Sequence, residues 1–270
     1  MNKNKIKIGF IGCGKMAGSI IKGLLASKDA QNYEVFGSEV SEEVAKLASE
    51  RLGIDVIFNN KELAQKVDVI VIATKPMYVL NVVEEIKPVF SSEKLLISIA
   101  AGVSTKKINS VLTEHRVVRV MPNTPALLGV GIAGVAKGAL ATSADVDFVM
   151  NLMATVGKSV QIDEAQIDVL TAISGSGPAF FYQVIEDMAR AGESLGLDYE
   201  KSLLLATQTA LGSAQMILNR GAVSVQTLID NVATKGGCTF VGITTMKEEN
   251  SAQMFAKVIA DTTKKASELG

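Results

Sequence analysis

The fold of this chain is decided by one segment near its N-terminus, Ile6-Lys7-Ile8-Gly9-Phe10-Ile11-Gly12-Cys13-Gly14-Lys15-Met16-Ala17. A short apolar strand is followed there by a glycine-rich turn and the start of an amphipathic helix. The Gly-x-Gly-x-x-Ala spacing is typical of dinucleotide-binding turns when it stands between a strand and a helix. Gly12 allows the tight turn, Gly14 lets a pyrophosphate approach the backbone, and Ala17 keeps the helix close to the strand. The simpler alternative is an ordinary strand–helix turn.

We expect the phosphates of a dinucleotide to lie at the N-terminus of this helix, where backbone N–H groups favour an anion. The residues predicted to contact the cofactor at this turn are Ile11, Gly12, Cys13, Gly14, Lys15 and Met16.

Around this segment, short apolar runs alternate with helical patterns as far as about residue 160. The expected strands are 5–11, 33–36, 67–73, 95–100, 117–121, 131–135 and 159–162. The expected helices are 16–27, 42–52, 77–86, 105–112 and 143–153. Apolar strands that alternate with helices indicate a parallel sheet covered on both faces. We therefore predict a Rossmann-like α/β domain over residues 1–162.

The pattern changes near residue 163, after which only amphipathic helices are expected. Their predicted ranges are 164–173, 178–194, 199–218, 224–231, 242–247 and 252–267. The run Leu203-Leu204-Leu205-Ala206 places apolar side chains on more than one helix face, as in helices that pair between subunits. We predict an all-α dimerisation domain over residues 163–270.

The composition excludes several classes of function. The chain has 270 residues with 27 Lys+Arg and 28 Asp+Glu, so its net charge of −1 offers no field for nucleic acid or an anionic membrane. No apolar run of roughly 18 residues suggests a membrane span. The two cysteines match neither a disulfide framework nor metal-ligand spacing. We expect a cytoplasmic protein without a metal.

The end of the second expected strand bears on which dinucleotide is used. A carboxylate at Glu39 can accept hydrogen bonds from the ribose diol of NADH and would repel the 2′-phosphate of NADPH. Ser38 and Asn60 can serve either cofactor, and no arginine follows Ser38 to hold a phosphate. These residues favour NADH without excluding NADPH, and Glu39 is alternatively a solvated loop carboxylate.

Two further strand ends are expected to line the same crevice, because ligands bind at the carboxyl ends of strands in open α/β sheets. They are Ala73-Thr74-Lys75-Pro76 and Ile99-Ala100-Ala101-Gly102. Pro76 holds Lys75 extended, a suitable pose toward the nicotinamide ribose. The alternative is a surface lysine.

Three polar loops are candidates for the substrate side. Met121-Pro122-Asn123-Thr124-Pro125 either positions a ligand or is only a tight turn. Ser174-Gly175-Ser176-Gly177-Pro178-Ala179 precedes a helix and by default only caps it. The loop Thr234–Thr239 has consecutive amides at Gly237, Cys238 and Thr239 that can surround a carboxylate.

Together these motifs resemble the Δ1-pyrroline-5-carboxylate reductase family, in the same order and over essentially the whole chain. The resemblance rests on residues 9–16, 73–76, 100–103, 121–125, 174–179 and 230–239, of which the last two are close to diagnostic. It implies NADH- or NADPH-dependent reduction of a cyclic imine to L-proline, the last step of proline biosynthesis. It also implies a homodimer whose active site lies between the domains and is completed at the dimer interface, with rings of dimers (a decamer) as a larger assembly.

The resemblance also implies roles for individual residues. The amides of Gly237 and Cys238, helped by the Thr234 hydroxyl, would hold the substrate carboxylate, and the Thr239 hydroxyl would contact the ring nitrogen. Asn231 would lie at the same junction beside the cofactor. The predicted cofactor contacts outside the glycine-rich turn are Ser38, Glu39, Asn60, Ala73, Thr74, Lys75, Pro76, Ala100, Ala101 and Asn231.

The chain departs from the family pattern before the paired glycines, where Thr234-Lys235 replaces the usual Ser-Pro. Threonine keeps the hydroxyl, whereas Lys235 loosens the loop and adds a cation. Imine reduction needs little acid–base machinery, since catalysis can come from positioning, and the single histidine, His115, is expected at the surface. Two alternatives remain: a β-hydroxyacid dehydrogenase-like reductase, and a non-catalytic regulatory protein that binds the nucleotide.

Overall fold

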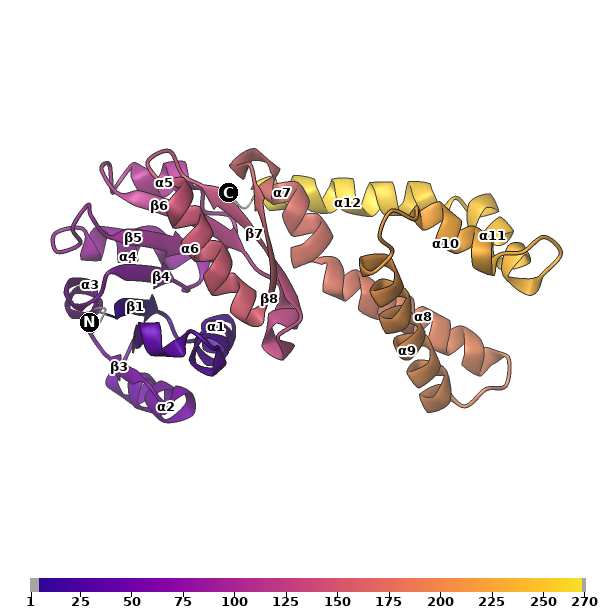
Figure 1. Ribbon diagram of the computed structural model, residues 1–270, viewed down its shortest axis with the longest axis horizontal. Coiled ribbons are helices and arrows are strands. Elements are labelled where there is room, and N and C mark those ends of the chain that lie inside the picture. Colours follow the sequence, from indigo (N-terminus) through magenta and orange to yellow (C-terminus); the bar gives the residue numbers. More distant parts are fainter. Residues whose placement is uncertain (1–4, 269–270) are drawn as a thin grey trace. The chain divides into compact units, whose positions relative to one another are not determined.

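The computed structural model describes residues 5–268 and contains an eight-stranded sheet among them (Figure 1). The strand order is β3-β2-β1-β4-β5-β6-β7-β8. The strands are β1 Ile6–Ile11, β2 Tyr33–Ser38, β3 Asp55–Ile57, β4 Val69–Ile72, β5 Leu95–Ser98, β6 Arg116–Met121, β7 Gly131–Lys137 and β8 Gly157–Ile162.

Not every strand of the sheet runs in the predicted parallel direction. From β3 to β6 all neighbours are parallel, but β7 runs antiparallel to β6, and β8 is parallel to β7. The reversal follows from the short η3 connection, Thr124–Leu128, because a parallel crossover needs a dozen or more residues. The sequence pattern also missed β3, a three-residue strand at the sheet edge.

Helices cover both faces of the sheet, as predicted for this fold. One face packs against α1 Lys15–Ala26, α2 Glu42–Leu52 and α6 Ser143–Met153 around Phe10 and Ile97. The other packs against α3 Asn60–Lys66, α4 Val79–Ile86 and α5 Thr105–Asn109 around Ile70 and Leu96. Three short 3-10 turns complete this part: η1 Ala30–Asn32, η2 Pro76–Tyr78 and η4 Ala154–Val156.

The strand order places a topological switch between β1 and β4. From β1 the chain moves outward to β2 and β3, and it then returns to lay β4 on the other side of β1. The loops after β1 and β4 therefore diverge at the carboxyl edge of the sheet, which is where open α/β sheets bind their ligands.

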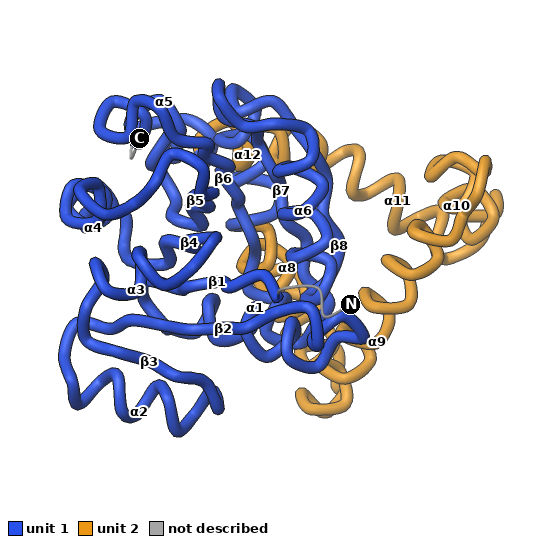
Figure 2. The backbone as a smooth tube through the Cα atoms, turned by 60° about the vertical axis from the view of Figure 1, so that its left-hand side comes forward, with its two compact units in different colours: residues 1–176, 262–270 blue, residues 177–261 orange. Residues whose placement is uncertain are grey.

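The chain divides into two compact units, residues 1–176 with 262–270 and residues 177–261 (Figure 2). The first unit contains η5 Glu164–Gln166, α7 Ile167–Leu170 and the π-helical turn η6 Thr171–Gly175. The change of sequence pattern at residue 163 thus lies inside this unit, because α7 packs against β7.

The second unit is helical and leaves much apolar surface exposed. Its helices are α8 Gly177–Ser194, α9 Tyr199–Leu218, α10 Val225–Val232 and α11 Cys238–Glu248, and α12 Ser251–Glu268 begins in it. Ala189 and Ala206 are buried where α8 packs on α9. Large side chains such as Phe181, Leu204 and Leu205 are more than half exposed. No helix of residues 5–268 has the length and apolarity of a membrane span.

Candidate cofactor and substrate sites

The turn after β1 approaches the end of β4 so closely that only glycine fits at residue 12. Gly12 has φ +87°, and a Cβ on it would lie 3.0 Å from the carbonyl oxygen of Ala73. Its N–H donates to Ser38 O at 2.9 Å, while Ala73 N–H donates to Ile11 O at 2.9 Å. The ends of β1, β2 and β4 are thereby joined around one turn.

Gly14 is the N-cap residue of helix α1, and the N-terminus of this helix is open. No side chain of residues 5–268 caps it, and a Cβ added to Gly14 would meet none of their atoms within 4 Å. By contrast, serine or asparagine side chains cap α2, α3, α5 and α10, at Ser41, Asn59, Ser104 and Ser224. The first N–H groups of α1 lack helical partners and can bind an anion, as a pyrophosphate requires.

Cys13 links the glycine-rich turn to the end of β2 and to α2. Its N–H donates to Glu39 Oε1 at 2.7 Å, and its carbonyl accepts from Arg51 Nη2 at 2.5 Å. Its thiol is buried, and this burial, reinforced by the nearby charge of Glu39, raises the thiol pKa to about 12. A Cβ on Gly37 would lie 2.5 Å from Cys13 Sγ, so a side chain larger than hydrogen at residue 37 would collide with the sulfur.

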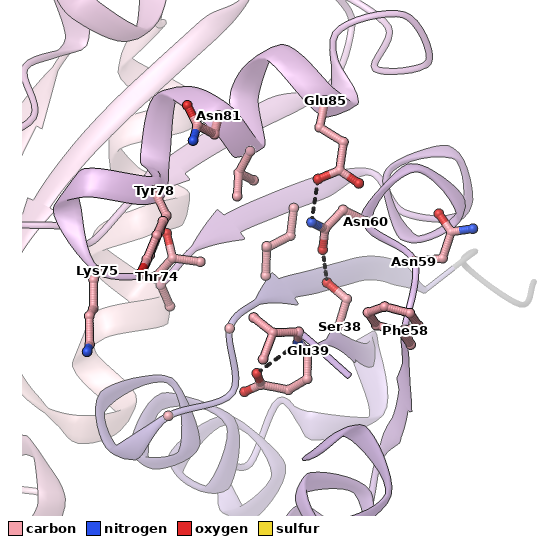
Figure 3. Close-up of a pocket in the computed structure, with 16 residues that line it drawn as sticks. Ser38, Glu39, Phe58, Asn59, Asn60, Thr74, Lys75, Tyr78, Asn81 and Glu85 are labelled. Atoms are coloured by element: carbon pink, nitrogen blue, oxygen red, sulfur yellow. Dashed lines mark hydrogen bonds between the residues drawn. The ribbon is translucent and has the colours of Figure 1, made fainter. Parts of the chain in front are cut away.

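A cavity of about 780 Å³ opens at the switch point between β1 and β4 (Figure 3). The predicted cofactor residues that line it are Ile11, Gly12, Gly14, Ser38, Glu39, Asn60, Ala73, Thr74 and Lys75. Thr74 Oγ1 is buried without a partner among the described residues, so a bound polar group could satisfy it. The open end of α1 and this hydroxyl both fit a dinucleotide.

A chain of hydrogen bonds crosses the floor of the cavity. Ser38 Oγ donates to Asn60 Oδ1 at 2.7 Å, and Asn60 Nδ2 donates to Glu85 Oε2 at 2.8 Å. Asn60 begins α3, a helix that the sequence pattern missed although Asn59 caps it by accepting from Glu62 N–H at 3.0 Å. The lining residues that the sequence interpretation did not name are Val40, Phe58, Asn59, Tyr78, Asn81, Val82 and Glu85.

Other predicted cofactor residues lie at the edges of this cavity or outside it. Cys13 shares a neighbouring hollow with Glu39 and Arg51, and Lys15 lines a hollow along α1. The structure does not place Met16, Pro76, Ala100 or Ala101 in the lining of the cavity. Asn231 belongs to α10 in the second unit.

The loop predicted to hold a carboxylate forms the start of α11, four residues earlier than expected. Gly237 occupies the N-cap position with no side-chain cap, so Cys238 and Thr239 are the first two helical residues. Their N–H groups have no helical partners, whereas the Gly237 N–H donates to Thr234 O at 2.9 Å. Of the three predicted amides, those of Cys238 and Thr239 are the ones available to an anion.

Comparison with known proteins identifies the chain's relatives. Over 265 residues it is 37% identical to the pyrroline-5-carboxylate reductase of Methanosarcina acetivorans, and the matched segment covers 98% of each of the two chains. The chain belongs to the pyrroline-5-carboxylate reductase family. Residues 164–269 match the family model described as pyrroline-5-carboxylate reductase dimerisation, and residues 7–102 match that of the coenzyme F420-dependent NADP oxidoreductases.

Solved structures of pyrroline-5-carboxylate reductases agree with this fold over its full length. The enzyme from Coxiella burnetii has a TM-score of 0.92 at 34% identity, with 99% of each chain covered. That from Plasmodium falciparum, solved with NADP bound, has a TM-score of 0.84 at 32% identity over 100% of each chain. The predicted fold class, a Rossmann-like domain followed by an all-α region, is confirmed, and the chain is an oxidoreductase of the nicotinamide-dependent type.

Residues 5–268 contain no recognisable metal site. No group of three or more His, Cys, Asp or Glu side chains among them is arranged to hold a metal ion. The individual ligand contacts predicted for the cofactor and the substrate stay predictions.

Proposed function

We propose that this chain reduces 1-pyrroline-5-carboxylate to L-proline with NADH or NADPH, the last step of proline biosynthesis. One observation carries the proposal: two helices, α1 and α11, have glycine as their N-cap residue and no side-chain cap from residues 5–268, at the two loops predicted to bind ligands. One open N-terminus suits a pyrophosphate and the other a carboxylate. The full-length relationship to reductases of this name supports the assignment.

On the cofactor side, the glycine-rich turn holds the pyrophosphate while the cavity residues hold the adenosine. Ser38 and Asn60 are already ordered by their mutual hydrogen bond, and Thr74 Oγ1 is free to accept or donate one. When bound, the cofactor supplies a hydride from its nicotinamide ring. The chain's part is to hold that ring against the substrate, and such positioning contributes about 7–11 kcal/mol in favourable cases.

On the substrate side, the start of α11 holds 1-pyrroline-5-carboxylate. The N–H groups of Cys238 and Thr239 bind its carboxylate with help from the Thr234 hydroxyl, which lies in the tight turn closed by the Gly237 N–H. The Thr239 hydroxyl donates to or accepts from the ring nitrogen and so orients the imine carbon. When the imine nitrogen already carries a proton, hydride addition to that carbon converts the C=N bond to the secondary amine of L-proline, so no further proton has to be supplied by a side chain.

We further propose that NADH is preferred over NADPH. Glu39 keeps its carboxylate beside the glycine-rich turn through the Cys13 N–H, and its two oxygens retain lone pairs for a ribose diol. Glu85 adds a second acid to the cavity, where Lys75 is the one cation among the lining residues that the structure describes. A 2′-phosphate would meet net negative charge there.

The dimerisation region supports a homo-oligomer. We propose that α8, α9 and the following helices cover their exposed apolar side chains by pairing with a second copy, which completes the active site, and that dimers assemble into rings such as a decamer. A cytoplasmic location agrees with two free thiols at Cys13 and Cys238.

Turnover of the purified chain tests the proposal directly. Oxidation of NADH and NADPH is followed with 1-pyrroline-5-carboxylate and, in parallel, with a 3-keto acid. We expect turnover with the cyclic imine alone and a higher kcat/KM with NADH. Activity with the keto acid alone would favour the β-hydroxyacid dehydrogenase alternative. Tight cofactor binding without turnover of either substrate would favour the regulatory one.

A further inference from the structure

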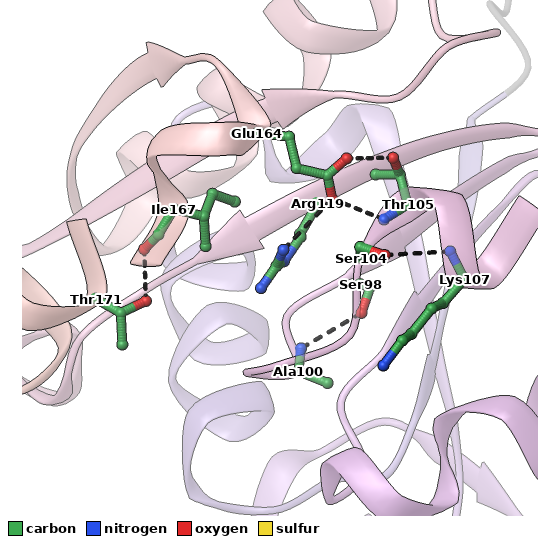
Figure 4. A network of polar contacts seen from close by, with 9 residues as sticks. All are labelled: Ser98, Ala100, Ser104, Thr105, Lys107, Arg119, Glu164, Ile167 and Thr171. Carbon is green, nitrogen blue, oxygen red and sulfur yellow. Dashed lines mark hydrogen bonds and ion pairs between the residues drawn. The ribbon is translucent and has the colours of Figure 1, made fainter. Parts of the chain in front are cut away.

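Glu164 clamps the first residue of α5 with both of its carboxylate oxygens (Figure 4). Oε1 accepts the Thr105 N–H at 2.7 Å, and Oε2 accepts the Thr105 hydroxyl at 2.5 Å. The two residues are 59 positions apart, and Glu164 stands at the beginning of η5, directly after β8. The carboxylate therefore joins the start of α5 to η5, the segment that follows β8.

The same carboxylate is the counter-ion of a buried arginine. Arg119 on β6 is only 6% exposed, and its Nη1 lies 3.4 Å from Glu164 Oε1. Its Nε has no partner among the described residues, so Arg119 depends on Glu164 for compensation of its charge. The buried guanidinium of Arg119 in turn restricts the positions that the Glu164 carboxylate can take.

Thr105 ends the loop that follows β5, and that loop lies on the cofactor side of the sheet. The other end of the loop is held at Ser98, whose buried hydroxyl accepts the Ala100 N–H at 3.4 Å. Ser98 is also the register partner of Arg119 across β5 and β6. The loop that carries Ala100 and Ala101 is thus held near one end by the Ser98 hydroxyl and at the other by the contact of Thr105 with Glu164 (Figure 4).

We propose that Glu164 is a positioning residue for the cofactor: by holding Thr105 it fixes the loop 99–104 in the conformation that receives the nicotinamide half of the dinucleotide. This proposal rests on the proposed function, and within it on the cofactor contacts of Ala100 and Ala101 that the family resemblance implies. Glu164 itself touches neither cofactor nor substrate in this scheme. Its effect is transmitted through Thr105, with Arg119 keeping the carboxylate in place.

Direct binding of NADH to the full-length protein provides the test, because it does not require turnover. Thr105→Val removes one of the two clamping bonds and keeps the shape of the side chain, and Glu164→Ala removes both. Asp145→Asn is the matched control: its carboxylate also pairs with a β6 arginine, Arg116, at 2.5 Å, but at the first residue of the strand, three positions before Arg119. Thermal unfolding of each variant is measured alongside.

We expect the Kd for NADH to rise about fivefold in Thr105→Val, the change that loss of one hydrogen bond produces, and more in Glu164→Ala. Asp145→Asn should lower the Tm but keep the Kd within about twofold. Because Glu164→Ala leaves Arg119 uncompensated, the double variant Arg119→Met/Glu164→Ala is included, and we expect a recovered Tm with the weak binding retained.

Three results would overturn the proposal: unchanged Kd in Thr105→Val and the double variant, an equal loss of binding in Asp145→Asn, or recovery of binding together with Tm in the double variant. A wild-type protein that binds NADH but does not reduce 1-pyrroline-5-carboxylate would instead count against the proposed function alone.

Discussion

The carboxylate of Glu39 accepts the backbone N–H of Cys13 at 2.7 Å, which ties the end of β2 to the glycine-rich turn after β1. The carboxylate is therefore fixed within the cofactor cavity before any ligand arrives, although Glu39 stands in a loop. A fixed negative charge discriminates more sharply than a mobile one, because it cannot move away from an incoming phosphate.

Replacing Glu39 should change which cofactor is used. In Glu39→Gln we expect the ratio of kcat/KM for NADPH to that for NADH to rise about 10-fold, because the repulsion of the 2′-phosphate is lost. The measurement is steady-state kinetics with each cofactor at saturating substrate. The control is Glu34→Gln, which removes the same charge five residues earlier on β2, about 16 Å away and beyond the Debye length. An unchanged ratio in Glu39→Gln would remove this residue from cofactor selection.

Thr239 is expected to contribute to the chemical step through its hydroxyl. Thr239→Ala should lower kcat/KM for 1-pyrroline-5-carboxylate about 10-fold or more, because the polar contact to the ring nitrogen is lost while the amide at the start of α11 remains. Thr239→Ser retains the hydroxyl and should keep most of the activity. If the serine and alanine variants lose activity equally, the hydroxyl is not the group that matters.

Lys235 should assist substrate capture by its charge alone. It precedes Gly236, whose φ of +82° turns the chain toward the open end of α11, and its side chain is exposed. We expect Lys235→Met to raise KM for the substrate about threefold at low salt and to have no effect at high salt, as is usual for exposed charges. Lys247→Met, in the last turn of the same helix, is the control. A salt-independent effect would point to loop conformation instead of charge.

The two cysteines should differ strongly in reactivity. The pKa of the buried Cys13 thiol is raised to about 12, so at pH 8 its thiolate is scarce, whereas Cys238 is exposed at the substrate loop. Mass spectrometry after iodoacetamide treatment of the native protein should show one adduct, on Cys238, together with loss of activity. Cys238→Ala should be active and resist the reagent. Full activity after complete labelling of Cys238 would place it away from the substrate.

The raised pKa of Cys13 also predicts how stability depends on pH. The folded thiol keeps its proton up to about pH 12, whereas the unfolded thiol loses it near 9.0. Between these two pKa values the folded state therefore binds more protons than the unfolded state. The contribution of the Cys13 thiol to the free energy of unfolding consequently falls as the pH rises from 9 toward 12. Urea unfolding of wild type and Cys13→Ala at pH 8 and 10.5 should show a steeper pH-dependent loss of stability in wild type. Parallel losses would contradict this assignment.

Much of the fold could be predicted from the local sequence pattern. The features that were missed are short elements and the direction of one strand, which depends on residues far apart in the sequence. The helix 42–52 is correct to the residue because Ser41 caps it and Gly53 ends it in the left-handed conformation. Strand β3 and helix α3 were missed, since three residues carry too little periodicity and the helix is mostly polar. The direction of β7 was also wrong, because a buried strand is apolar throughout in either direction.

In the candidate site, too, local features could be predicted from the sequence, whereas contacts between distant residues could not. The glycine-rich turn and the loop at Gly237 could be found from the sequence because glycines with special backbone requirements are visible there. The start of α11 at Cys238 was placed too late, since no capping side chain marks it. The contact of Arg51 with Cys13, and that of Glu164 with Thr105, join residues 38 and 59 positions apart, and no spacing rule reports them.

The 2.5 Å approach that a methyl group on Gly37 would make to Cys13 Sγ has a consequence for protein engineering and for the divergence of relatives. The two positions share one volume, so they can change together more easily than singly. Cys13→Ala alone leaves a void and Gly37→Ala alone produces an overlap, whereas the pair exchanges a sulfur for a methyl group in nearly the same place. A form of the protein without a buried thiol is therefore best made by altering both strand ends at once.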